Sequence, residues 1–194
     1  MIKFLGTNKL KTAVFISGNG SNLKNLIEFS LFKKLPIKIS FIVSSNSNSK
    51  GLNFAKKYKI KSQIYKFNNK TKDENEILKY LKRNNISMIC LAGFMKILSN
   101  NFIKKYSGTI LNIHPSLLPK YRGLNTHRRA IENKEKFSGC TVHFVNSKLD
   151  SGKVVLQKRV KITNKDTPKS LSKKILKLEH FLYPKAILKV ISNF

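Results

Sequence analysis

The feature that most limits how this sequence can fold is a series of short apolar runs, each followed by an amphipathic segment. Continuous apolar runs are typical of parallel strands buried on both faces. The strand-like runs lie at residues 12–17, 37–43, 62–67, 87–92 and 109–113. Between them, apolar residues recur at helical spacing, as at Ile77, Leu78 and Leu81. The helix-like segments lie at residues 22–32, 51–58, 72–84 and 99–106. This alternation predicts an α/β fold with a Rossmann-like, doubly wound and mostly parallel sheet.

The pattern changes after residue 113. A helical segment at 126–134 is followed by two strand-like runs, 140–145 and 154–162, and the segment between these runs contains the turn signal Asp150-Ser151-Gly152. This arrangement predicts an antiparallel strand in the C-terminal half of the sheet. Thr167-Pro168 then predicts the start of a long helix. Its expected core-facing residues are Leu171, Ile175, Leu178, Leu182 and Ile187.

The length of 194 residues suits one α/β domain, expected at 12–194 behind a frayed extension at 1–11. Neither a secretory signal nor the roughly 18 apolar residues of a membrane span is recognisable. Cys90 and Cys140 lie in apolar runs, which indicates buried free thiols and a cytoplasmic location.

The net charge of +30, from 39 Lys and Arg against 9 Asp and Glu, permits two explanations. One is nucleic-acid binding, because basic surfaces release counterions from phosphate backbones. The other is a composition rich in Lys, Asn, Ile and Ser along the whole chain. Because the lysines form no tract and alternate with no aromatic residues, we expect only weak, nonspecific binding of RNA.

Asn112 and His114 lie at the end of the 109–113 strand, just before Pro115. Residues two apart on an extended segment point the same way. Their side chains can therefore donate two hydrogen bonds to one oxygen, which is the requirement for stabilising an oxyanion. The structural alternative is that both side chains satisfy backbone groups where the strand ends.

Asp150 is one of few acids in the chain and falls in the predicted turn. A carboxylate beside His114 would raise the pKa of the imidazole, and burial would raise the pKa of Asp150 itself. The alternative is an Asx turn closed by Ser151-Gly152.

The remaining histidines, His127, His143 and His180, are interpreted as hydrogen-bonded structural groups. The sequence shows no metal-ligand spacing and no Ser-His-Asp arrangement.

The loop Gly18-Asn19-Gly20-Ser21-Asn22 joins the first strand to the first helix. Such a turn presents backbone N–H groups to a phosphate. It differs from a dinucleotide-binding loop because Leu23 stands where the third glycine would be.

Five segments in order resemble the glycinamide ribonucleotide transformylase family of folate-dependent formyltransferases. They are AVFISGNGSNLKNLI (13–27), LAGFMKILS (91–99), LNIHPSLLPKYRG (111–123), GCTVHFV (139–145) and LDSGKVVLQ (149–157). The resemblance implies the formyltransferase fold and direct formyl transfer from 10-formyltetrahydrofolate to the amine of 5'-phosphoribosylglycinamide. It implies no metal, and small molecules as the only specific partners.

The resemblance also implies roles for individual residues. Asn112 and His114, the latter as imidazolium, would stabilise the oxyanion, and Asp150 would keep His114 charged and assist proton transfer. Residues 12–108 would form the phosphate-binding half and 109–194 the catalytic and folate-binding half. The implied ribonucleotide-binding residues are Gly18, Asn19, Gly20, Ser21, Asn22 and Glu179, the last being otherwise a solvated salt-bridge partner.

For the folate, the resemblance implies an apolar slot together with backbone contacts. A family arginine corresponds here to Lys72, or to Lys70 if the gap moves, and lysine lacks the bidentate fork of arginine. The implied folate-binding residues are Lys72, Leu91, Met95, Lys96, Ile97, Leu98, Asn112, Val145, Asn146, Ser147, Lys148, Leu149 and Asp150.

Two related activities remain as alternatives. Methionyl-tRNA formyltransferase would carry an extra C-terminal domain and formyltetrahydrofolate deformylase an N-terminal regulatory domain, and we expect neither domain here. The deformylase, or another folate-dependent formyltransferase, is the closest alternative. The sequence leaves the oligomeric state open between monomer and homodimer.

Overall fold

The computed structural model describes residues 9–32 and 36–192. The chain falls into two compact units, the first ending at Leu111 and the second beginning at Asn112. Most of the extension expected at 1–11 lies outside the described residues. Its last two residues belong to the first strand, which begins at Leu10 rather than at residue 12.

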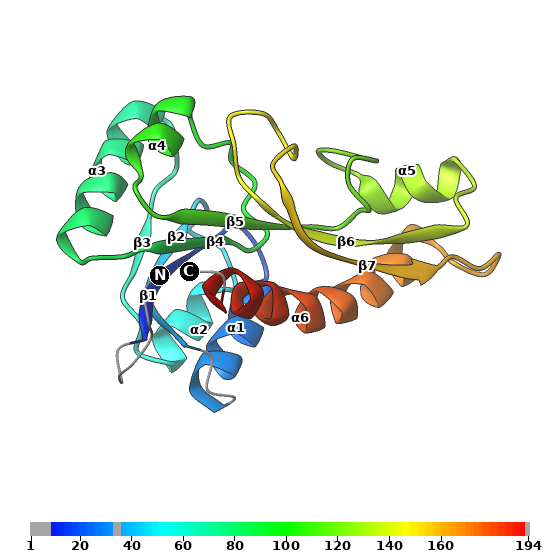
Figure 1. The fold of residues 1–194 in the computed structure, drawn as a ribbon, viewed down its shortest axis with the longest axis horizontal. Coiled ribbons are helices and arrows are strands. Elements are labelled where there is room, and N and C mark those ends of the chain that lie inside the picture. Colours follow the sequence, from blue (N-terminus) through cyan, green and yellow to red (C-terminus); the bar gives the residue numbers. More distant parts are fainter. Residues whose placement is uncertain (1–8, 33–35, 193–194) are drawn as a thin grey trace. The chain divides into compact units, whose positions relative to one another are not determined.

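Within the described residues, the first unit contains four complete parallel strands and four helices. The strands are β1 (Leu10–Ile16), β2 (Ile37–Ser44), β3 (Ser62–Ile64) and β4 (Met88–Leu91). They lie in the order β3-β2-β1-β4 and pair in parallel. The helices are α1 (Ser21–Phe32), α2 (Leu52–Lys57), α3 (Lys70–Arg83) and α4 (Asn100–Lys105). Figure 1 shows α1 and α2 on one side of these strands and α3 and α4 on the other, as right-handed crossovers require.

Strand β5 (Thr109–His114) continues from the first unit into the second, which also contains α5 (Thr126–Glu132), β6 (Phe137–Phe144), β7 (Val154–Lys161) and α6 (Pro168–Ser192). The full sheet has seven strands in the order β3-β2-β1-β4-β5-β6-β7, and β6 pairs antiparallel with β7. The predicted fold class, a mostly parallel sheet with an antiparallel strand in the C-terminal half, is therefore confirmed.

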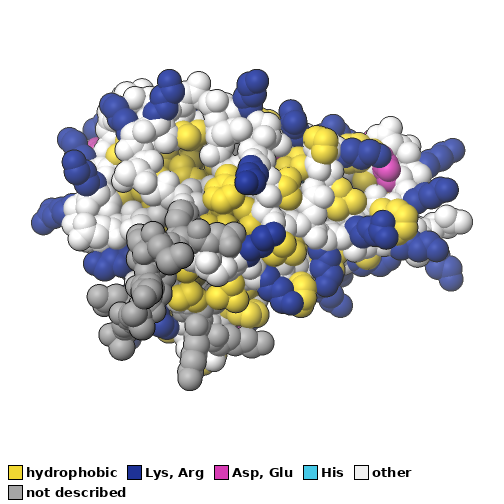
Figure 2. All heavy atoms as spheres, viewed as in Figure 1, with side chains coloured by type: hydrophobic (Ala, Val, Ile, Leu, Met, Phe, Trp, Pro, Cys, Tyr) yellow, Lys and Arg dark blue, Asp and Glu magenta, His cyan; other side chains and the backbone are white. Residues whose placement is uncertain are grey.

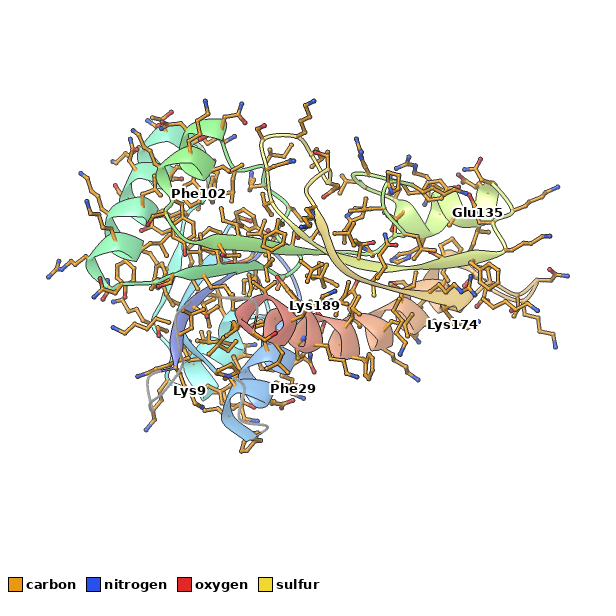
Figure 3. The ribbon with its side chains drawn as sticks, viewed as in Figure 1. Lys9, Phe29, Phe102, Glu135, Lys174 and Lys189 are labelled. Carbon is orange, nitrogen blue, oxygen red and sulfur yellow. The ribbon has the colours of Figure 1, made fainter. Side chains whose placement is uncertain are left out.

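The core of the first unit is centred on β1, where residues 12–16 are completely buried. Phe15 packs edge-on against Phe94 and Phe102, the second of which Figure 3 labels on α4. The side chain of Ser99 caps α4 by accepting a hydrogen bond from the Phe102 N–H, as the sequence predicts. In the second unit, α6 packs on β6 and β7.

Among the predicted boundaries that differ from the structure, those of β3 and α3 have local reasons. Strand β3 ends at Ile64 rather than at residue 67. Phe67 has a left-handed backbone, and Asp73 accepts its N–H at 2.7 Å, so the chain turns away from the sheet there. Helix α3 begins at Lys70 because the Asn69 side chain caps it by accepting a hydrogen bond from the Lys72 N–H.

The predicted apolar stripe of α6 is correct except at one position. Leu171, Ile175, Leu182 and Ile187 are buried, but Leu178 is only half-buried and Glu179 occupies the core-facing position instead. Near the start of this helix, Lys174 (labelled in Figure 3) pairs with Asp166 at 2.6 Å.

Both cysteines are buried and free, as predicted, and burial raises the pKa of the Cys140 thiol to about 12. Over the described part of the chain, no helix combines the length and the apolar character needed to span a bilayer. On the face in Figure 2, Lys and Arg side chains are scattered over the surface, and acidic side chains are few.

Candidate active site

The second unit brings Asn112, His114 and Asp150 together. The strand alternation of β5 directs Asn112 and His114 to the same side, as predicted, and Asp150 comes from the loop between β6 and β7. His114 Nδ1 lies 3.4 Å from Asp150 Oδ2, and Asn112 Nδ2 lies 3.4 Å from Asp150 Oδ1. The side chains of His114 and Asp150 are only 7% and 8% exposed. The arrangement is therefore a compact, largely dry cluster of one amide, one imidazole and one carboxylate.

Asp150 does not use its carboxylate in an Asx turn. That turn is made by Asn146, whose Oδ1 accepts the Lys148 N–H at 3.0 Å and the Ser151 hydroxyl at 3.0 Å. The Asp150 carboxylate instead accepts the Gly123 N–H at 2.8 Å. Asp150 has a left-handed backbone, with φ 45°.

The hydrogen bonds around His114 determine where its proton lies. Its Nε2 is 2.9 Å from the Tyr121 carbonyl oxygen, which can only accept, so Nε2 carries a hydrogen. The other nitrogen, Nδ1, faces the Asp150 carboxylate. Proton exchange at this imidazole is therefore assigned to Nδ1.

The two expected influences are present, since Asp150 raises the pKa of His114 and burial raises that of Asp150, but the net pKa shift of each group is downward. Burial is the largest influence on His114. Together with the charges of His143 and Arg129, it lowers the pKa of His114 against the opposing effects of the Tyr121 carbonyl and the Asp150 carboxylate. For Asp150, burial is the largest single influence and raises the pKa. It is outweighed by the combined effect of His143, the Gly123 N–H and His114, so the pKa of Asp150 is lowered. These directions favour an ionised Asp150 beside a neutral imidazole.

His143 belongs to this cluster, although its position in the middle of a strand indicated only a structural role. Its Nδ1 donates to the Phe144 carbonyl at 2.8 Å, which leaves Nε2 to accept a hydrogen bond from Asn112 Nδ2 at 3.2 Å. His143 Nε2 also lies 3.7 Å from Asp150. The side chain is hydrogen-bonded as predicted, but its partner is a candidate catalytic residue. The alternation of residues along β6 did not predict the contact between His143 and Asn112.

His127, on α5, differs from its predicted role as a hydrogen-bonded structural group. Its Nδ1 is buried and has no hydrogen-bond partner among residues 9–32 and 36–192. Burial, with a smaller contribution from His114, lowers its pKa. The lowered pKa favours the neutral form of His127.

In the first unit, the loop at 17–22 is held by close backbone packing. Gly20 has φ 72°, and a Cβ there would come within 2.5 Å of the Gly51 Cα. The Gly18 carbonyl accepts the Ser49 hydroxyl at 2.6 Å and the Gly51 N–H at 3.1 Å. Helix α1 begins at Ser21, so its first N–H groups have no acceptor within the helix.

The predicted folate-binding segment at 91–98 adjoins this loop. Met95 N donates to the Ser17 hydroxyl at 2.8 Å, and Ser17 N donates to the Gly93 carbonyl at 3.1 Å. Met95 and Ile97 are 66% and 62% exposed, while Leu91 and Leu98 are buried. The segment therefore presents apolar side chains beside the loop at 17–22.

Other candidate residues are distributed between the units. Lys72 and Lys96 are exposed in the first unit, and the segment 145–150 of the second is largely exposed except at Val145 and Asp150. Glu179 is only 8% exposed and lies close enough to the Cys140 thiol to raise its pKa, so the alternative of a solvated salt bridge is wrong.

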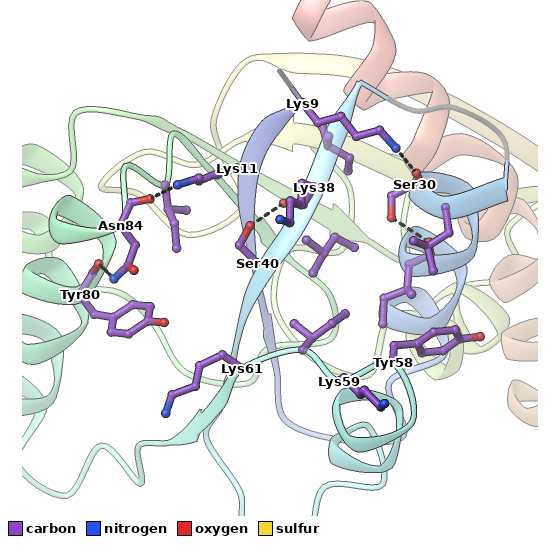
Figure 4. A pocket seen from close by; sticks show the side chains of 16 residues that line it. Lys9, Lys11, Ser30, Lys38, Ser40, Tyr58, Lys59, Lys61, Tyr80 and Asn84 are labelled. Atoms are coloured by element: carbon purple, nitrogen blue, oxygen red, sulfur yellow. Dashed lines mark hydrogen bonds between the residues drawn. The ribbon is translucent and has the colours of Figure 1, made fainter. Parts of the chain in front are cut away.

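A separate pocket of about 650 Å³ in the first unit is lined by none of these candidates. Figure 4 shows it around the amino-terminal ends of β1 and β2, where Lys9 donates to the Ser30 carbonyl and Lys11 to the Asn84 carbonyl. It lies at the end of the strands opposite to the loop at 17–22, because that loop follows the carboxyl end of β1.

The chain resembles known proteins over most of its length. Residues 10–187 match the family model described as formyl transferase. The phosphoribosylglycinamide formyltransferase of Haemophilus influenzae is 41% identical over 180 residues, covering 91% of this chain and 85% of the relative. The trifunctional purine biosynthetic protein adenosine-3 of Gallus gallus is 38% identical over 96% of this chain, which spans only 19% of that relative.

Among solved structures, the phosphoribosylglycinamide formyltransferase of Brucella melitensis superposes with a TM-score of 0.88 at 40% identity. The superposition covers 94% of this chain and 95% of that one.

Proposed function

The chain belongs to the formyl transferase family, and we propose that it transfers the formyl group of 10-formyltetrahydrofolate to the amine of 5'-phosphoribosylglycinamide. The products are formylglycinamide ribonucleotide and tetrahydrofolate, a step of purine synthesis. The observation that carries this proposal is the compact cluster of Asn112, His114 and Asp150 in a chain that matches the family over residues 10–187. A cytoplasmic location belongs to the same proposal.

The cluster suits direct attack by an amine on a formyl carbon. In the neutral imidazole with a hydrogen on Nε2, His114 Nδ1 carries no proton and lies beside the Asp150 carboxylate, so it can accept the proton that the attacking amine loses. The imidazolium that results is stabilised by Asp150, and its charge stabilises the oxyanion that forms at the same time. The proton then passes to the folate nitrogen as its bond to the formyl carbon breaks, directly or through water.

Asn112 acts as the second oxyanion donor in this proposal. Its amide orientation is defined because Nδ2 faces two acceptors, His143 Nε2 and Asp150 Oδ1. Substrate oxygen replaces one of these contacts as charge develops. Preorganised donors of this kind contribute about 3–4 kcal/mol each to transition-state stabilisation.

The first unit supplies binding groups. The N–H groups of Gly20, Ser21 and Asn22 at the start of α1 suit a monophosphate, which needs a helix N-terminus but not the third glycine of a dinucleotide loop. The exposed apolar side chains of Met95 and Ile97 suit the pterin of the folate co-substrate. The remaining proposed binding residues are Gly18, Asn19, Lys72, Leu91, Lys96, Leu98, Asn112, residues 145–149, Asp150 and Glu179.

The decisive experiment is turnover with 5'-phosphoribosylglycinamide and 10-formyltetrahydrofolate, followed by the absorbance change of the folate. We expect formyl transfer that requires both substrates. Formate release at the same rate without the ribonucleotide would favour the deformylase instead. Tight RNA binding at physiological salt, with no formyl transfer, would favour a nucleic-acid-binding function.

A further inference from the structure

The loop at 121–125, between β5 and α5, has an unusual backbone. Tyr121, Gly123 and Asn125 all have left-handed backbones, with φ values of 56°, 75° and 58°. A non-glycine residue in this region costs on the order of 1 kcal/mol or more, and it persists only where surrounding contacts hold it. The loop therefore needs contacts that hold its backbone in this conformation.

Two backbone groups of this loop contact the candidate catalytic pair. The Tyr121 carbonyl accepts from His114 Nε2 at 2.9 Å, and the Gly123 N–H donates to Asp150 Oδ2 at 2.8 Å. The first contact selects the tautomer of His114, and the second favours the ionised form of Asp150. The position of the loop thus determines where the proton of the pair lies.

Arg129, on α5, is attached to the other side of this loop. Its Nη1 donates to the Arg122 carbonyl at 2.8 Å and to the Leu124 carbonyl at 3.4 Å. The guanidinium carbon lies 5.0 Å from the centroid of the Tyr121 ring. A planar guanidinium can stack on a ring and bond to carbonyls at once, which the point charge of lysine cannot do.

We propose that Arg129 is a positioning residue for formyl transfer: it holds the 121–124 backbone in the conformation that orients His114 and Asp150. The expected effect of Arg129 on kcat rests on the proposed function. Its effect on the backbone at 121–124 and on the tautomer of His114 does not. Arg129 touches no reacting atom: it acts through Tyr121 and Gly123, and its charge also lowers the pKa of His114.

The first test compares Arg129→Gln and Arg129→Lys with a control, Arg128→Gln, which removes the same charge from an exposed neighbour on α5. A displaced catalytic group loses rate rather than affinity, so Arg129→Gln should lower kcat roughly tenfold and change KM for the ribonucleotide less than about twofold. Arg129→Lys should behave like Arg129→Gln, since it keeps only the charge. Wild-type kcat in Arg129→Gln, full rescue by lysine, or an equal loss in Arg128→Gln would overturn the proposal.

The second test is independent of turnover. In 15N NMR at pH 7.5, His114 of the wild-type protein should show protonated Nε2 and unprotonated Nδ1, and Arg129→Gln should show averaging of the two tautomers. An unchanged His114 spectrum in a folded Arg129→Gln variant would overturn the positioning role. If the wild-type protein transferred no formyl group, the proposed function would fail, whereas the NMR result would still decide the role of Arg129.

Discussion

The loop at 17–22 in the first unit differs from the Asn112–His114–Asp150 cluster in the second. The proposed task of the loop depends on backbone groups and that of the cluster on side-chain groups. The loop uses backbone: a left-handed Gly20 packed on Gly51, and N–H groups at the start of a helix. The cluster uses side chains from β5 and from the loop between β6 and β7.

This difference determines how each region should respond to substitution. A backbone site tolerates changes of side chain but not of conformation, because it binds through N–H groups of the main chain. A side-chain cluster tolerates conformational adjustment poorly. It tolerates chemical substitution even less, because each of its side chains needs a defined protonation state. The following predictions test this contrast.

The largest effect is expected for Asp150→Asn. Asparagine has the same shape, accepts the Gly123 N–H, and tolerates the left-handed backbone at this position. It cannot stabilise an imidazolium, so kcat should fall by roughly 10²–10⁴-fold, the range for lost acid–base assistance. KM for the ribonucleotide and the melting temperature should change little.

The control for this variant is Asp166→Asn, two residues before the start of α6. The Asp166 carboxylate binds Lys174 and accepts the Ser170 hydroxyl, and these contacts lower its pKa. This variant should lose stability and keep its kcat. The contrast fails if both aspartate variants lose activity to the same extent.

The backbone site is tested by Gly20→Ala against Gly18→Ala. An alanine at position 20 must adopt φ 72°, and its Cβ would meet Gly51. A Cβ at position 18 would meet nothing within 4 Å. Gly20→Ala should lower the free energy of unfolding by about 1–3 kcal/mol and raise KM for the ribonucleotide. Urea denaturation and steady-state kinetics measure the two effects. Equal behaviour of the two glycine variants would contradict the close-packing explanation.

A smaller effect is expected at His143. His143→Leu removes the acceptor that orients the Asn112 amide, so kcat should fall roughly tenfold. His143→Gln keeps an acceptor and should recover part of the loss. If both variants retained wild-type kcat, His143 would have only the structural role that its strand position indicated.

The smallest effect concerns pH. The pKa of His114 is lowered in the folded protein, so between pH 6.5 and the folded value the unfolded chain binds more protons. The contribution of His114 to stability is therefore complete above pH 6.5 and is lost as pH falls below it. His114→Gln should flatten the decline of the urea midpoint between pH 7.5 and 5.5. An unaltered decline would show that His127, whose pKa is also lowered, is responsible instead.

The sequence by itself determined the order of strands and helices, because buried parallel strands need continuous apolar runs and amphipathic helices need helical spacing. It also predicted that Asn112 and His114 point the same way, since strand alternation is a local property. The loop at 17–22 could be recognised for the same reason: glycines and a helix start are adjacent in the chain.

Only the tertiary structure decided the state of the cluster. Burial lowers the pKa of His114, although a neighbouring carboxylate alone predicted the opposite, and burial depends on segments far away in the chain. The contacts of Tyr121 with His114, of Gly123 with Asp150 and of His143 with Asn112 link residues up to 31 positions apart, and no local pattern encodes them. Protonation depends on the summed environment of a group, and packing alone creates that environment.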